Sequence, residues 1–131
     1  MKTIKLGLIK GRHEMPVDAY LLEQTTFATA YNDAKQAIVN VATTGCDTIQ
    51  LYATGLTRAL LGVIAGFNEL HNTTTVCDYL ATTPNSQRLE VYEYNNETQS
   101  YELTTTFVAQ YTMYALPDSP VFEMVGRVVT I

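Results

Sequence analysis

Two apolar segments, residues 2–9 and 48–53, alternate in the manner of β-strands, and each is followed directly by a short polar motif. Between them, residues 26–42 repeat apolar side chains at three- and four-residue steps, which is the pattern of an amphipathic helix. A strand, a helix and a second strand in this order form a parallel crossover. Both polar motifs would then emerge at the same edge of one sheet, where ligands bind in open α/β proteins.

The rest of the chain repeats this strand–helix pattern once and then changes character. Residues 56–71 form a second amphipathic pattern, on which Gly62 and Gly66 lie one turn apart. Strand-like segments then cover residues 73–81, 88–94, 99–107, 108–116 and 121–131, with turn residues at 95–98 and 117–120. Residues 15–24 leave two alternatives open, a helix that starts near Pro16 or an edge strand.

These patterns predict a single α/β domain over residues 1–131. We expect one mixed sheet of about five to seven strands. Its N-terminal half is a Rossmann-like βαβα unit, and its C-terminal region is an antiparallel, tyrosine-rich hairpin. The tyrosines of that region suit cross-strand packing or a protein interface. The chain is 47% apolar, which is enough material for a packed core.

The first polar motif, residues 11–16, contains Arg12, His13 and Glu14 in succession. Imidazole titrates near neutral pH, so His13 is the candidate catalytic acid or base. Arg12 can hold a phosphate or carboxylate through two parallel hydrogen bonds, and Glu14 belongs to the same candidate ligand site. The alternative is a solvated turn in which Arg12 and Glu14 pair with neighbouring side chains, and the residues do not decide between the two.

The second motif joins the end of a strand to the start of a helix and contributes Thr54, Gly55, Thr57 and Arg58 to the candidate ligand site. Gly55 lets the backbone approach a ligand closely, and the amides and dipole of a helix start favour an anion. Thr54 and Thr57 add hydroxyl donors, and Thr57 is also a candidate N-cap. The alternative is an ordinary helix start, because any strand-to-helix connection needs such a turn.

The remaining polar residues point to no metal site and to no cofactor. Cys46 and Cys77 lack the spacing of metal ligands, and two cysteines make a poor disulfide framework. We expect both thiols to be buried. His71 ends the second helix, where it suits contact with the terminal carbonyls.

The charge distribution limits the classes of partner. The first twelve residues carry four basic and no acidic side chains, but the whole chain has a net charge of −5. An acidic body argues against broad nucleic-acid binding, which needs many phosphate contacts. The longest apolar run, residues 59–67, is far shorter than the ~20 residues that span a membrane. The N-terminus lacks the apolar core of a secretory signal, so we expect a cytoplasmic protein without a membrane partner.

Arg12-His13 after a strand, followed by Thr54-Gly55-Leu56-Thr57 at a strand-to-helix turn, resembles the small Rossmann-like proteins of CRISPR systems. The resemblance covers roughly residues 1–70, and it implies a protein that senses or cleaves cyclic oligoadenylates. The chain is also similar to short proteins of bacterial mobile elements, although no motif carries that similarity.

Two functional hypotheses follow. The first is a site for a nucleotide or another phosphate compound, and it leaves open whether His13 performs a metal-independent cleavage. The second is a non-enzymatic interaction or regulatory protein of a mobile element, which acts through an acidic, tyrosine-rich surface. The second hypothesis includes a homodimer, predicted from the glycine-spaced helix and the exposed tyrosine area.

Overall fold

The computed structural model describes residues 2–11, 14–72, 86–115 and 122–131. Its elements, in chain order, are β1 (Thr3–Ile9), β2 (Ala19–Leu22), α1 (Ala30–Ala42), β3 (Thr48–Ala53), α2 (Thr57–Asn72), β4 (Arg88–Asn95), β5 (Ser100–Ala115) and β6 (Phe122–Thr130). The strands form one six-stranded sheet in the order β2-β1-β3-β4-β5-β6. This arrangement confirms the predicted α/β fold with a mixed sheet.

The predicted adjacency of the first two long strands is also confirmed. β1 and β3 are parallel neighbours, with Ile4 opposite Ile49 and Leu6 opposite Leu51. β2 and β4 continue the parallel part on either side, and β5 and β6 are antiparallel. After β1 the chain moves outward to β2, and after β3 it moves in the opposite direction to β4. The strand order therefore reverses between β1 and β3.

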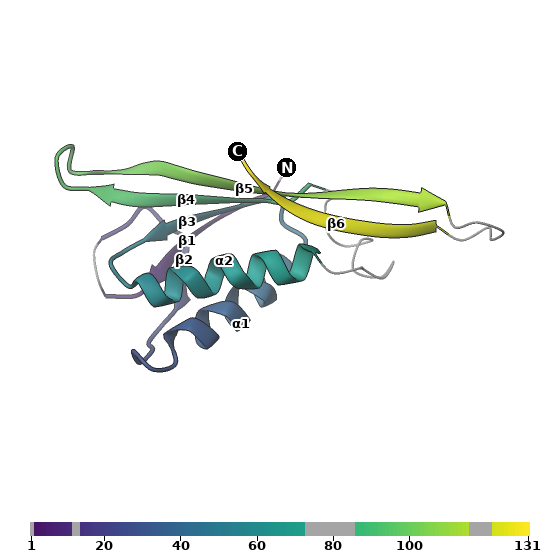
Figure 1. The fold of residues 1–131 in the computed structure, drawn as a ribbon. Helices are drawn as coiled ribbons and strands as arrows, with labels where there is room; N and C mark the ends of the chain where they lie inside the picture. Colours follow the sequence, from purple (N-terminus) through teal and green to yellow (C-terminus); the bar gives the residue numbers. More distant parts are fainter. Residues whose placement is uncertain (1, 12–13, 73–85, 116–121) are drawn as a thin grey trace.

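Both helices cover the same face of the sheet (Figure 1). The crossovers β2–α1–β3 and β3–α2–β4 advance in the same direction across the sheet. Two crossovers of the same hand that advance together place their helices on one face. Because the carboxyl end of β3 leads directly into α2, the start of α2 lies at the polar edge of the parallel strands.

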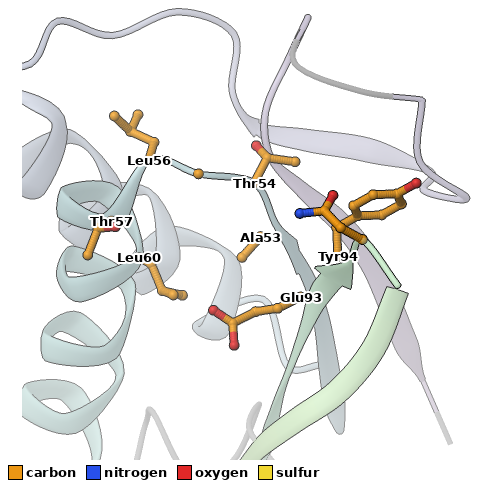
Figure 2. A pocket seen from close by; sticks show the side chains of 9 residues that line it. Ala53, Thr54, Leu56, Thr57, Leu60, Glu93 and Tyr94 are labelled. Carbon is orange, nitrogen blue, oxygen red and sulfur yellow. The ribbon is translucent and has the colours of Figure 1, made fainter. Parts of the chain in front are cut away.

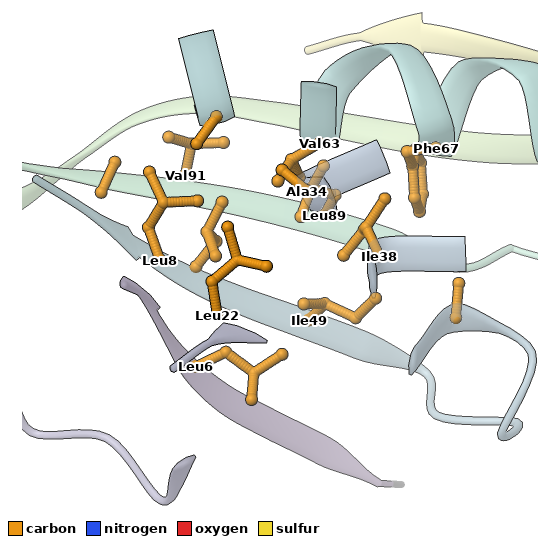
Figure 3. Packing of buried hydrophobic residues seen from close by; sticks show 14 of the residues in the cluster. Leu6, Leu8, Leu22, Ala34, Ile38, Ile49, Val63, Phe67, Leu89 and Val91 are labelled. Atoms are coloured by element: carbon orange, nitrogen blue, oxygen red, sulfur yellow. The ribbon is translucent and has the colours of Figure 1, made fainter. Parts of the chain in front are cut away.

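The core fills the space between the helices and this face of the sheet (Figure 3). Its largest fully buried apolar side chains are Leu8, Ile38, Ile49, Leu51, Val63, Phe67 and Leu89. They come from β1, β3 and β4 on the sheet side and from α1 and α2 on the helix side. Full burial of such a side chain contributes roughly 1.5–3 kcal/mol, so this layer fixes the helices over the parallel strands.

Of the two alternatives for residues 15–24, the structure has the edge strand, β2, which pairs in parallel with β1. Two other boundaries differ from the sequence prediction. The first helix begins at Ala30 because residues 26–29 form a turn, in which the Thr26 side-chain oxygen accepts from the Thr29 amide at 3.2 Å. Phe27 is consequently 72% exposed and lies outside the helical stripe. The segments predicted as strands 99–107 and 108–116 form one strand, β5, because no turn residue interrupts them.

The predicted strand at 73–81 and the turn at 117–120 lie outside the described residues, as does Cys77. Cys46 is buried, as expected.

Gly62 and Gly66 explain how closely α2 approaches α1. A Cβ on Gly62 would collide with the carbonyl oxygen of Tyr31, and one on Gly66 would lie 2.7 Å from both Ile38 Cγ2 and the Lys35 oxygen. Both glycines are therefore used within the chain, and this side of α2 is not open to a second copy. The homodimer itself stays a prediction, which light scattering would test, but it no longer draws support from these glycines.

Candidate functional site

A pocket with a volume of about 260 Å³ lies at the carboxyl ends of β3 and β4, beside the first turn of α2 (Figure 2). We call it the edge pocket. Its lining residues are Ala53, Thr54, Gly55, Leu56, Thr57, Leu60, Glu93, Tyr94 and Asn96. The pocket is thus built by the second sequence motif on one side and by the end of the β4–β5 hairpin on the other.

The first turn of α2 presents backbone groups to this pocket. Leu56 occupies the capping position, and its carbonyl oxygen accepts from the amides of Ala59 and Leu60 at 3.1 and 3.2 Å. A leucine side chain cannot cap a helix, and the predicted cap, Thr57, is instead the first helical residue. Among the described residues, nothing accepts a hydrogen bond from the Arg58 amide. The helix start therefore keeps donor capacity and its positive dipole end.

Thr54 is the most buried polar side chain of the pocket wall. It is only 5% exposed, and its hydroxyl has no hydrogen-bond partner. A buried polar group left unpaired costs about 1–3 kcal/mol. Such a cost is unusual in a folded protein and is often associated with a functional site.

Gly55 differs from the other glycines of the chain. Its φ is not in the left-handed region, and a Cβ built on it would meet nothing within 4 Å. Neither backbone conformation nor packing requires glycine at this position. Glycine at this position would allow a ligand to approach the backbone closely.

Glu93 contributes the only carboxylate among the described lining residues, and none of them is basic. It lies opposite Ala53 in the β3–β4 register, and its side chain extends from β4 toward α2 (Figure 2). Its carboxylate has no hydrogen bond or ion pair with a described residue. The pocket therefore combines a helix start, which favours negative charge, with an unpaired negative group.

The structure brings together three of the predicted site residues, Thr54, Gly55 and Thr57. Arg58 points elsewhere, since its Nη1 donates to the Phe27 oxygen at 3.2 Å and its guanidinium lies 4.4 Å from the centre of the Phe27 ring. Glu14 is exposed and does not line the pocket. Arg12 and His13 lie outside the described residues.

Sequence reasoning missed the second wall of the pocket, which consists of Glu93, Tyr94 and Asn96. Residues 88–94 were interpreted only as one arm of an antiparallel hairpin. The second crossover, however, makes β4 a parallel neighbour of β3, so its carboxyl end joins the same edge. The available signal was the strand–helix–strand order over residues 48–94.

A second polar cluster, at the other end of α2, is centred on the buried side chains of His71 and Gln87. His71 is fully buried, with Nδ1 2.5 Å from the Tyr111 hydroxyl and Nε2 2.7 Å from Gln87 Oε1. This differs from the predicted contact with helix carbonyls. Gln87 Nε2 donates to the carbonyl oxygens of Ala42 and Cys46 at 3.0 and 2.8 Å.

The hydrogen bonds of Gln87 determine the role of His71 Nε2. Because both Gln87 amide hydrogens are used by carbonyl oxygens, its Oε1 accepts from His71 Nε2–H. The Tyr111 hydroxyl can donate to Nδ1 or accept from it, and burial favours the neutral ring, in which Nδ1 accepts. Burial lowers the pKa of His71, in spite of an opposing contribution from the Gln87 hydrogen bond. Burial likewise raises the pKa of the neighbouring Cys46 thiol, which makes it unreactive.

Tyrosines cluster on the sheet face opposite the helices, as expected for the hairpin. The rings of Tyr52 and Tyr92 stack with centroids 4.9 Å apart, and Tyr101 meets Tyr52 edge-on at 5.3 Å. Tyr94 contacts Tyr101 at 5.3 Å. The four rings therefore pack largely against one another.

Searches against protein-family models, curated proteins and solved structures each returned no match. Within the described ranges, no three His, Cys, Asp or Glu side chains are grouped so that they could hold a metal ion. No helix in that part of the chain has the length and apolar character needed to cross a membrane. Fold and site thus define a single-sheet α/β protein with a pocket at its polar edge.

Proposed function

We propose that this protein binds a small ligand in the edge pocket, with an acidic group of that ligand, such as a phosphate, against the first turn of α2. The observation that carries the proposal is the position of the pocket, at the carboxyl ends of parallel strands and beside a helix start. Ligands of open α/β sheets bind at this edge, and helix starts favour anions.

The size of the pocket favours a mononucleotide or a smaller compound. Its volume of about 260 Å³ lies slightly below the range of roughly 300–1,000 Å³ that is usual for ligand pockets. A cyclic oligoadenylate would extend well beyond it. A small phosphate compound is accordingly favoured over the cyclic oligoadenylate that the CRISPR resemblance implies. An acid–base role for His13 stays a prediction, as does the cytoplasmic location.

Thermal shift and calorimetry with inorganic phosphate and the common mononucleotides test this proposal. We expect at least one compound to bind, and Thr57→Val to weaken its binding. Thr3→Val is the matched control, because Thr3 is also exposed but lies in β1 and does not line the pocket. Absence of binding by every compound in the panel would overturn the proposal.

The second candidate function is an interaction or regulatory protein that uses the β4–β5 hairpin. Glu93, Glu97 and Glu102 form an acidic hollow there, and Leu103 is 50% exposed on the same hairpin. A basic protein surface is the matching partner. Binding to such a partner would weaken steeply with salt, whereas ligand binding in the edge pocket would saturate at one molecule per chain.

A further inference from the structure

Glu93 gives the edge pocket a chemical preference that the helix start alone does not provide. β4 places it on the helix side of the sheet, level with Ala53, and its carboxylate extends toward α2 (Figure 2). An ionised carboxylate only accepts hydrogen bonds. A ligand that contacts Glu93 therefore gains by offering hydrogen-bond donors at this point.

Among the described residues, no basic side chain lines the pocket or pairs with Glu93. Arg58 follows the lining residue Thr57 in the sequence, but its side chain contacts the carbonyl oxygen and the ring of Phe27. A bare phosphate compound would bring its negative charge close to this carboxylate without compensation. The opposite requirements of Glu93 and the helix start imply a ligand with two chemically different ends.

We propose that the ligand presents two parallel N–H donors to Glu93 and an acidic group to the first turn of α2. This inference rests on the proposed function of the pocket. Two parallel N–H groups match the two oxygens of a carboxylate, as in arginine–carboxylate pairs. Guanine carries such a pair on its Watson–Crick edge, and a guanidinium carries it on its planar head.

Two kinds of small molecule therefore share the required chemistry: a guanine mononucleotide and free arginine. Adenine places an acceptor beside its amino group and so would direct a lone pair at Glu93.

Calorimetry of the full chain with GMP, AMP, free arginine and inorganic phosphate tests the inference. We expect GMP or arginine to bind about tenfold or more tightly than AMP and phosphate. Which of the two binds identifies the source of the donor pair. Glu93→Gln should remove the preference, because a glutamine amide supplies one acceptor and one donor group in place of two acceptors.

Glu102→Gln is the matched control. Glu102 lies opposite Glu93 in the hairpin, carries the same charge and does not line the edge pocket. Equal binding of GMP and AMP, with no effect of Glu93→Gln, would overturn the inference and leave the proposed function in place. Absence of binding by all four compounds would overturn both. Glu93 is exposed, so thermal melting of Glu93→Gln should match that of the parent chain.

Discussion

The edge pocket and the cluster around His71 lie at opposite ends of α2, and they differ in whether their polar side chains have hydrogen-bond partners. In the cluster, the polar atoms of Gln87 and both ring nitrogens of His71 have partners within the chain. In the pocket, the Thr54 hydroxyl and the Glu93 carboxylate have none among the described residues. Satisfied polar groups stabilise a fold. In the pocket, by contrast, the Thr54 hydroxyl is buried without a described partner, and the exposed Glu93 carboxylate is available to a ligand.

The largest effect should come from removing the centre of the satisfied cluster. Gln87→Leu leaves His71 Nε2–H and the carbonyl oxygens of Ala42 and Cys46 without their amide partner. Because a buried unpaired group costs about 1–3 kcal/mol, we expect a loss of about 3 kcal/mol or more in the free energy of unfolding. Urea denaturation measures it, with Gln110→Leu at an exposed position of β5 as the control. Equal losses for both variants would contradict a structural role for the cluster.

The next effect concerns the glycines that set the distance between the helices. Gly66→Ala would push a methyl group against Ile38 and the Lys35 backbone. Overpacking costs about 1–3 kcal/mol, and the better helix propensity of alanine returns up to ~1 kcal/mol. We expect a net loss of about 1 kcal/mol in thermal or urea unfolding. An increase in stability would show that α1 can move away from α2 at little cost.

A pH effect should distinguish the neutral imidazole from the exposed charges. The folded-state pKa of His71 is lowered, so the unfolded chain binds the extra proton first as the pH falls. The contribution of His71 to the free energy of unfolding should therefore be constant above a pH of about 6.5. Below that pH, the free energy of unfolding should fall by up to ~1.4 kcal/mol per pH unit. Urea unfolding of the parent chain and His71→Gln at several pH values isolates the effect. Identical pH slopes for the two chains would contradict it.

The smallest effect on stability should come from the pocket glycine. Gly55→Ala places a methyl group in open space at an ordinary backbone conformation. Stability should rise by about 0.4–1 kcal/mol, because alanine restricts the unfolded chain. Binding of any pocket ligand should nevertheless weaken in calorimetry. Unchanged affinity would show that the ligand does not approach the backbone at this residue.

These differences also explain which features the sequence could predict. The alternation in residues 2–9 and 48–53 led to the correct placement of β1 beside β3, although the connection differs from the predicted one. The crossover starts from β2 and passes over β1 to reach β3. Residues 88–94 carried two signals, a hairpin with the next strand and a strand–helix–strand order with residues 48–53, and only the hairpin was used, although one strand can pair on both sides. Glu93 was therefore missed.

Individual side chains were harder to predict than elements. Arg58 lies at a helix start in the sequence, but that position does not determine whether its long side chain turns to the pocket or, as observed, to Phe27. His71 shows the same limit, because helix position predicted a contact with terminal carbonyls while burial and the distant Gln87 decided the outcome.

β5 connects two hairpins that hardly overlap. Its ladder with β4 reaches Val108 and its ladder with β6 begins at Phe107 (Figure 1). Two further backbone hydrogen bonds, from the Ala109 amide to the Gln87 oxygen and from the Ile131 amide to the Thr106 oxygen, extend this overlap by one residue at each end. Cooperative opening spreads through shared neighbours, and a two-stranded ribbon is marginal by itself. The β5–β6 end is nevertheless held to α2, because Tyr111 contacts His71 and the Val128 amide donates to Asn72 Oδ1 at 2.6 Å. Opening of this end would therefore also break the buried cluster around His71, so the helix that begins at the edge pocket is the same element that fastens the far hairpin.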